Sequence, residues 1–155
     1  GDVAPAFTLP AADAKGPAKA PVSLAALRGK VVVLAFYPAD RTGGCTAQLT
    51  KYRDEYRTLF GANAGSDVVL LPVSKDDLAS HASWAKDMNF PFALLSDTDL
   101  SVAEQYGAKG PGYATRSLFV IGKDGKVAYR EMRFNALSEQ AYRSMAEAIE
   151  KARKS

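Results

Sequence analysis

Residues 30–45 of the chain read KVVVLAFYPADRTGGC and contain its clearest structural signal. The first half, Lys30–Tyr37, consists of the lysine followed by an unbroken run of β-branched, aliphatic and aromatic residues. A run without polar alternation is typical of a strand that is covered on both faces. The second half, Pro38–Gly44, contains residues that interrupt regular structure, and a helical pattern begins directly after Cys45. The stretch therefore predicts a buried strand that passes through a tight loop into a helix.

Strands and helices continue to alternate on the C-terminal side of this stretch. We expect helices where apolar residues recur every three or four positions, and buried strands where short apolar runs lie between turn residues. The expected helices are Thr46–Phe60, Asp77–Met88, Leu100–Tyr106 closed by Gly107, and Glu139–Lys154 capped by Ser138; the expected strands are Asp67–Ser74, Phe92–Ser96, and a hairpin of Ser117–Ile121 with Lys126–Glu131. This order predicts an α/β domain in which a central mixed β-sheet is flanked by helices. On the N-terminal side, Pro10–Pro21 is rich in proline and small residues and is expected to form a surface loop.

The size and composition of the chain exclude several classes of protein. A chain of 155 residues with 47% hydrophobic and 24% charged residues is ordinary for one globular domain, which we expect to span residues 1–155. Size scaling predicts that about 69% of the surface of the unfolded chain is buried on folding, which excludes a disordered chain. No stretch approaches about 18 uninterrupted apolar residues, so no membrane span is expected. The net charge of +3 is spread along the chain rather than gathered in a patch, so no nucleic-acid binding is expected.

The chain has one cysteine, Cys45, and one histidine, His81. Neither an intramolecular disulfide nor a Cys-rich or His-rich metal site can be built from them, so we expect no metal and no cofactor. His81 and Trp84 are spaced for one face of a helix. We expect Trp84 in the core and His81 near the surface, without a catalytic role. Asp40 and Arg41 are expected to be surface charges of the loop.

The position of Cys45 favours reactivity. A lone cysteine is often a small buried hydrophobe, and the count of one leaves this interpretation open. The first turn of a helix, however, carries unpaired N–H groups and a partial positive charge, which favour the nucleophilic thiolate. Gly43 and Gly44 permit a tight turn and the close approach of a small ligand, and Thr42 adds a hydroxyl three residues before the thiol. Ligands of open α/β sheets also gather outside the carboxyl ends of the strands, where this loop lies.

The loop FYPADRTGGC, residues 36–45, resembles the active-site loop of the peroxiredoxins, whose pattern is P-x-x-x-[ST]-x-x-C. Pro38, Thr42 and Cys45 occupy the three fixed positions. Further segments are similar to that family in the same order along the chain: GDVAPAFTL at 1–9, LRGKVV at 27–32, FALLSD at 92–97 and RSLFVI at 116–121, while Thr46 and Arg53-Asp54 resemble the bacterioferritin-comigratory, or peroxiredoxin Q, branch. The resemblance implies a thioredoxin-like fold.

The resemblance also implies a role for each residue of the site. In that family a cysteine thiolate attacks a peroxide, forms a sulfenic acid and releases water or an alcohol. Cys45 would be this cysteine, Thr42 would hydrogen-bond the peroxide, and Pro38 would shield the site from water. Arg116 would lie beside the sulfur, whereas without the resemblance it would be interpreted as a solvated residue at the start of a strand. Backbone N–H groups at Gly44 and Cys45 are the remaining candidate donors to the substrate.

Gln48 and Thr50 follow the cysteine on the same expected helix. Gln48 either contacts the arginine or the loop, as an acidic or amide residue of that branch often does, or lies on the helix surface. Thr50 stands where many members of the branch carry a resolving cysteine, and the chain has no second cysteine. The resemblance therefore implies a 1-Cys peroxidase whose sulfenic acid is reduced by an external thiol: thioredoxin, glutaredoxin or glutathione.

Two other functions remain as alternatives. In a redox-sensing or binding module, Cys45 would be oxidised without efficient turnover. A thioredoxin-type disulfide oxidoreductase is disfavoured, because the C-x-x-C pair is missing. The long C-terminal domain of larger 1-Cys enzymes is absent, so a monomer or weak homodimer is expected. The chain begins with Gly1 rather than Met, so we expect that it has been processed or trimmed. A lone thiol suits the cytoplasm, and the periplasm is expected instead if a signal peptide was removed.

Overall fold

The computed structural model describes all residues from 1 to 155. Its elements in chain order are β1 (Thr8–Leu9), β2 (Ala11–Asp13), β3 (Gly16–Pro17), β4 (Val22–Ser23), the 3₁₀ helix η1 (Leu24–Leu27), β5 (Val31–Phe36), α1 (Gly43–Asp54), α2 (Tyr56–Phe60), β6 (Val68–Ser74), α3 (Leu78–Met88), β7 (Leu94–Ser96), α4 (Ser101–Gln105), β8 (Ser117–Ile121), β9 (Val127–Glu131) and α5 (Glu139–Lys154). None of these helices is long and apolar enough to cross a membrane.

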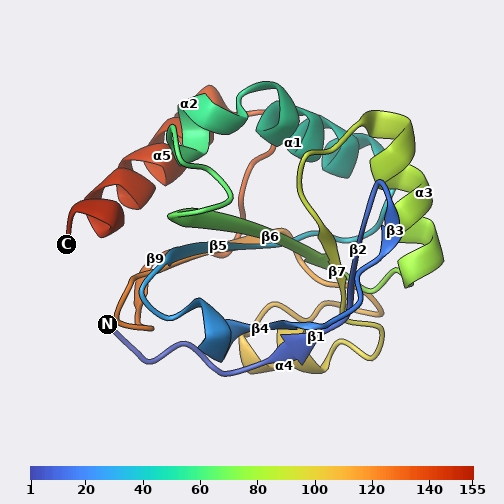
Figure 1. Cartoon of the computed structure of the whole chain (residues 1–155), viewed down its shortest axis with the longest axis horizontal. Coiled ribbons are helices and arrows are strands. Elements are labelled where there is room, and N and C mark those ends of the chain that lie inside the picture. The colour runs from blue at the N-terminus through green and yellow to red at the C-terminus, as the bar shows by residue number, and fades with distance from the viewer.

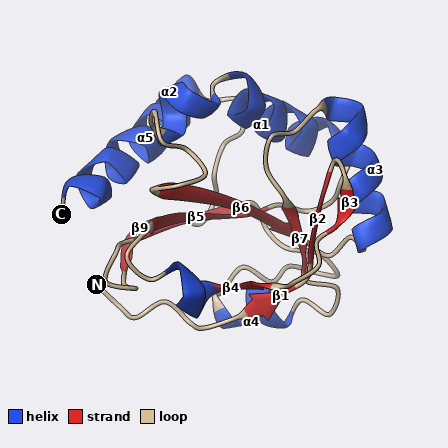
Figure 2. Cartoon of the chain, viewed as in Figure 1, coloured by secondary structure: helices blue, strands red, loops and turns tan.

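Seven of the strands form one central sheet in the order β3-β2-β7-β6-β5-β8-β9, and β1 pairs with β4 in a separate ribbon. The strands β5, β6 and β7 are parallel, whereas β8 and β9 on one side and β2 and β3 on the other join antiparallel. Helices α1, α2, α3 and α5 cover one face of the sheet, and α4 lies on the other face with the β1–β4 ribbon (Figure 1). Figure 2 shows the resulting layers of helix, sheet and helix, which confirm the predicted architecture.

The central strand β5 confirms the interpretation of the apolar run. Each of its six residues is at most 1% exposed. Val31, Val33 and Ala35 belong to the core cluster on the side of α1, α2, α3 and α5. The alternate residues, Val32, Leu34 and Phe36, belong to the cluster on the opposite face. Burial of each valine or leucine side chain stabilises the fold by about 1.5–3 kcal/mol, so β5 is anchored from both sides.

The prediction of a surface loop over Pro10–Pro21 is wrong for residues 11–17, which form the hairpin of β2 and β3. Ala11 and Ala12 are 2% and 0% exposed and belong to β2, which pairs antiparallel with β7. The chain then turns back into β3, helped by Gly16 at a φ of 116°. The small side chains of Ala11 and Ala12 fit this closely packed part of the sheet. Pro17 is tolerated because β3 is an edge strand, where a missing N–H breaks no ladder.

The helix predicted from Thr46 to Phe60 begins earlier and is divided in two. It starts at Gly43, so both glycines and Cys45 lie in its first turn. Glu55, with φ −116° and ψ 30°, separates α1 from α2. The apolar spacing continues across the break because both pieces pack on the same core cluster. The last helix, α5, has the predicted bounds, and the Ser138 hydroxyl accepts the N–H of Ala141 as the predicted cap.

Candidate active site

Cys45 lies just beyond the carboxyl end of β5, in the first turn of α1. Its side chain is fully buried. The first intrahelical hydrogen bond of this turn runs from the Thr46 N–H to the Thr42 carbonyl at 2.8 Å. The N–H groups of Gly44 and Cys45 precede that bond and have no intrahelical acceptor. The sulfur therefore sits at the positive end of a helix, beside free backbone donors.

Arg116 reaches the sulfur from a distant part of the chain. It precedes β8, which runs antiparallel to β5 with Ser117 opposite Phe36, so the pairing brings the start of β8 to the end of β5. The guanidinium Nη1 lies 3.4 Å from Cys45 Sγ. A guanidinium remains charged and presents several fixed donors, so it stabilises negative charge on the sulfur and on a bound oxygen.

Gln48 connects this pair to the core. Its side chain is 1% exposed, so a position on the helix surface is excluded. Arg116 Nη1 donates to Gln48 Oε1 at 2.7 Å, and Gln48 Nε2 donates to the Tyr52 hydroxyl at 2.9 Å. Burial raises the pKa of Tyr52, so this hydroxyl stays neutral. The chain of hydrogen bonds holds the guanidinium in one orientation over the sulfur.

Gly44 is required by the approach of Arg116. A Cβ atom at residue 44 would lie 2.8 Å from Arg116 Nη2, closer than real Cβ contacts. At the neighbouring Gly43, a Cβ atom would meet nothing within 4 Å. Of the two glycines, therefore, only Gly44 is needed to leave space for the Arg116 guanidinium.

Thr42 and Pro38 lie in the loop that leads to the cysteine. Thr42 is exposed, and its hydroxyl donates to the Ala39 carbonyl at 3.0 Å. This bond leaves the lone pairs of the Thr42 oxygen available as acceptors. Pro38 is partly buried at the end of β5. Neither side chain has a hydrogen bond to Cys45 in this structure, so their roles toward a peroxide stay predictions.

Two expectations about charged residues near the loop are wrong. His81 is fully buried rather than near the surface, and the Asp40 side chain is 2% exposed. They pair with each other, His81 Nδ1 lying 2.8 Å from Asp40 Oδ2. The interpretation of Arg41 is confirmed, because its half-exposed side chain bonds to Asp87 at 2.7 Å on the surface of α3. Trp84 lies in the core at 1% exposure, as predicted.

A polar histidine on the same helix face as a tryptophan was the available signal for the buried pair. The shared face with Trp84 could have indicated a buried histidine, but its partner comes from a loop that is 41 residues away in sequence. No group of three or more histidine, cysteine or acidic side chains could hold a metal ion.

The central sheet is thioredoxin-like, a buried thiol lies at the start of a helix, and an arginine contacts the sulfur. These features define a protein of the thioredoxin fold with a single-cysteine site. The sequence matches the AhpC/TSA family over residues 1–130, and the chain belongs to this family. It is 40% identical over 136 residues to a putative peroxiredoxin bcp of Coxiella burnetii, which covers 83% of this chain and 84% of that protein. Together these findings agree with the resemblance that the loop and the flanking segments indicate.

Two further comparisons extend this result. The chain is 42% identical over 132 residues to a chloroplastic peroxiredoxin Q of Triticum aestivum. The match covers 83% of this chain but 57% of that protein, so the chain spans little more than half of the plant relative. The crystal structure of peroxidoxin BcpB from Mycobacterium tuberculosis superposes with a TM-score of 0.79 at 29% identity, covering 97% of this chain and 96% of that one.

Proposed function

We propose that this chain is a thiol-dependent peroxidase in which Cys45 reduces hydrogen peroxide and organic hydroperoxides. The observation that carries the proposal is the 3.4 Å contact between Arg116 Nη1 and Cys45 Sγ in a member of the AhpC/TSA family. The contact places a permanent cation where both the thiolate and a peroxide oxygen need one. Membership of the family alone would leave the reacting group unassigned.

The proposed reaction starts with the thiolate of Cys45. The sulfur attacks the distal oxygen of a peroxide ROOH, so that an S–O bond forms while the O–O bond breaks. Sulfur loses two electrons and becomes a sulfenic acid. The departing RO⁻ takes a proton from water and leaves as an alcohol, or as water when the substrate is hydrogen peroxide.

Stabilisation of the departing oxygen contributes more than ionisation of the thiol. An ordinary thiol with a pKa of about 8.5 is roughly 3% ionised at pH 7, so complete ionisation gains only about thirtyfold. The lower nucleophilicity of a more acidic thiolate takes back part of that gain. Each preorganised donor to a developing oxyanion contributes roughly 10²–10³ in rate. Arg116 and the free N–H groups of Gly44 and Cys45 are the donors that we assign to this task.

The other loop residues have supporting roles in this proposal. Thr42 orients the peroxide through its hydroxyl oxygen, which accepts the proton of the peroxide O–H group. Pro38 lacks an N–H group and keeps water away from the site. Gln48 holds Arg116 in place, since its amide oxygen accepts from Nη1 at 2.7 Å.

An external thiol closes the proposed cycle, because Cys45 is the only cysteine of the chain. The sulfur of the external thiol attacks the sulfenic sulfur, an S–S bond forms, and water leaves. A second thiol then releases Cys45 as the thiolate and carries away a disulfide. Thioredoxin, glutaredoxin and glutathione are the candidate reductants. This requirement suits the cytoplasm, where such thiols are kept reduced.

Turnover with a small thiol tests the proposal. The protein is mixed with hydrogen peroxide or cumene hydroperoxide and with dithiothreitol as reductant, beside Cys45→Ser as the control. We expect many turnovers for the natural chain and none above background for the variant. A single stoichiometric oxidation that no thiol reverses would instead support the redox-sensing module. Repeating the assay with thioredoxin, glutaredoxin and glutathione identifies the reductant.

A further inference from the structure

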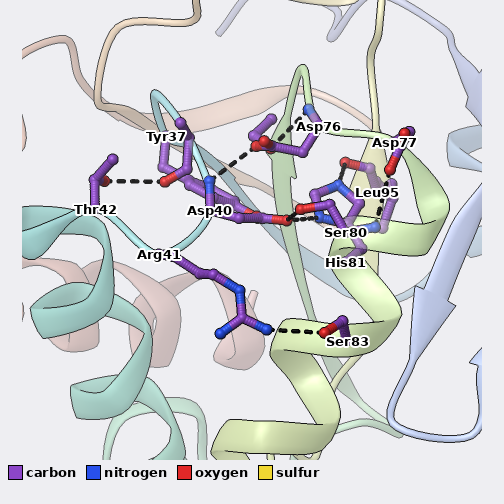
Figure 3. A network of polar contacts seen from close by, with 12 residues as sticks. Tyr37, Asp40, Arg41, Thr42, Asp76, Asp77, Ser80, His81, Ser83 and Leu95 are labelled. Carbon is purple, nitrogen blue, oxygen red and sulfur yellow. Dashed lines mark hydrogen bonds and ion pairs between the residues drawn. The ribbon is translucent and has the colours of Figure 1, made fainter.

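A polar cluster outside the contact between Cys45 and Arg116 joins the loop after β5 to helix α3 (Figure 3). At its centre, Asp40 Oδ2 lies 2.8 Å from His81 Nδ1 and accepts the Ser80 hydroxyl at 2.7 Å. The other oxygen, Oδ1, accepts the Tyr37 hydroxyl at 2.7 Å. The Asp40 and His81 side chains are 2% and 0% exposed. Two ionisable groups withdrawn from water in this way are costly unless they are paired and fully hydrogen-bonded.

The partners of His81 determine where its protons lie. The ring nitrogen Nε2 is 3.0 Å from the Leu95 carbonyl, which can only accept, so Nε2 carries a hydrogen. The other ring nitrogen faces the carboxylate of Asp40, which is also an acceptor when ionised. A neutral imidazole has a single N–H and cannot donate in both directions. Both contacts are satisfied by an imidazolium.

The surroundings of Asp40 favour its ionised form. Hydroxyl donors from Tyr37 and Ser80 already point at its oxygens, and they match a carboxylate rather than an acid. Burial, and after it the negative charge of Asp40, raises the pKa of Tyr37 well above its ordinary value, so this hydroxyl stays a donor. His81 is the only ion-pair partner of Asp40.

The other charged groups around His81 are engaged elsewhere. The Asp76 carboxylate, in the connection from β6 to α3, accepts the backbone N–H of Asp40 and the Ser74 hydroxyl. The Asp77 carboxylate accepts the N–H of Ser80 at the start of α3. Strand β2, which packs against α3, presents two alanines, and its Asp13 carboxylate accepts the N–H of Lys15.

We propose that His81 is held as an imidazolium against ionised Asp40, and that the two are positioning residues for the loop 38–42, which leads to Cys45. This proposal rests on the proposed role of Cys45 as the reacting thiol. Asp40 is fixed through its side chain and also through its backbone N–H, which donates to Asp76 Oδ2 at 2.9 Å. The next residue, Arg41, has a φ of 64°, and Thr42 is already the N-cap of α1. Because Asp40 lies only two residues before this N-cap, its position fixes the position of the first turn of α1, which contains Cys45.

Loss of the second proton from His81 would break one of the two contacts. A lone pair of the ring would then face either the Asp40 carboxylate or the Leu95 carbonyl oxygen, and both of these groups are acceptors that repel it. The two contacts therefore hold Asp40 and His81 together only while both ring nitrogens carry a hydrogen.

Nuclear magnetic resonance tests the protonation directly, since the chain has one histidine and gives one pair of ring nitrogen signals. With ¹⁵N-labelled reduced protein at pH 7, we expect both ring nitrogens of His81 to be protonated. The Cys45→Ser variant should give the same result, because the pair does not depend on peroxidase activity. One unprotonated ring nitrogen in the folded protein would overturn the proposal, whatever the activity.

Variants of Asp40 test the positioning role. Asp40→Ala removes the acceptor and should slow oxidation of Cys45 by peroxide roughly tenfold to a hundredfold, the scale of a small misplacement. Asp40→Asn can donate from its amide to the free Nδ1 of a neutral His81, so it should restore most of the rate that Asp40→Ala loses. Asp87→Asn is the matched control: it removes the negative charge from the exposed ion pair between Arg41 of the loop and Asp87 of α3, and should change the rate less than about twofold.

The outcomes separate the positioning role from a purely structural one. The rate is measured by stopped flow at pH 7, with Trp84 as the single tryptophan reporter and thermal unfolding as the check on folding. An unchanged rate in Asp40→Ala, or a rate in Asp40→Asn as low as that of Asp40→Ala, would overturn the proposal. If Asp40→Ala does not fold, the rate of Asp40→Asn decides: a loss of more than about tenfold against the natural chain would overturn the positioning role. A natural chain that does not react with peroxide would instead contradict the proposed function and leave the histidine measurement valid.

Discussion

Arg116 Nη1 lies 3.4 Å from Cys45 Sγ although 71 residues separate the two in sequence. The antiparallel pairing of β8 with β5 creates this contact, because it places Ser117 opposite Phe36 at the end of the central strand. The strand pairing thus positions the Arg116 guanidinium beside the Cys45 thiol at the start of α1. The site therefore depends on a local sequence pattern around Cys45 and on a long-range pairing of two strands.

Replacement of Arg116 by methionine is expected to slow peroxide reduction by at least about 10², because one preorganised donor to the departing oxygen is lost. Stopped-flow rates over a pH series measure the effect. The loss should persist at a pH where the thiol is fully ionised, which separates stabilisation of oxygen from stabilisation of the thiolate. Arg116→Lys keeps the positive charge but not the planar set of donors, so its rate should lie between those of the natural chain and of Arg116→Met. A loss below threefold at full ionisation would contradict the assignment.

Gly44→Ala should reduce activity while leaving the helix intact. The added Cβ would lie 2.8 Å from Arg116 Nη2, so the guanidinium must move away from the sulfur. Alanine favours helix by about 0.5–1 kcal/mol over glycine, so thermal stability should not fall in parallel with the rate. The matched control is Gly43→Ala, where the added atom meets nothing within 4 Å. Equal rates for the two variants would show that the close approach of Arg116 is not needed.

Gln48→Leu is expected to lower both stability and rate. It removes the acceptor of Arg116 and the donor to Tyr52, and a polar group left unpaired in the interior costs about 1–3 kcal/mol. Urea unfolding measures the first effect, and the rate of Cys45 oxidation, which should drop about tenfold as Arg116 loosens, measures the second. Gln48→Glu keeps an acceptor for Arg116 and should stay much closer to the natural chain. A stable Gln48→Leu protein with an unchanged rate would remove Gln48 from the site.

The parts of this protein that follow from local sequence are β5, the position of Cys45 and the bounds of α5. In each, the signal and the structure that it forms involve neighbouring residues. The pairing of His81 with Asp40 is different, because it depends on how α3 packs against the loop, and no local pattern specifies that packing. The same holds for β2: its two alanines carry little strand propensity, and pairing with β7 fixes their conformation.

Thr50→Cys tests whether the start of α1 opens after oxidation of Cys45. Thr50 lies five residues after Cys45 on the same helix, so helix geometry sets the two Cα atoms about 8.7 Å apart. A disulfide needs Cα atoms closer than about 7 Å, so the two cysteines cannot bridge while α1 is intact. We therefore expect that peroxide converts Thr50→Cys to an intramolecular disulfide only together with a loss of helix, measured by mass spectrometry and circular dichroism. Thr50→Ser, with no second thiol, should stop at the sulfenic acid and keep its helix. A persistent sulfenic acid in Thr50→Cys would show that α1 stays closed, and that an external thiol must reach the buried sulfur by another route.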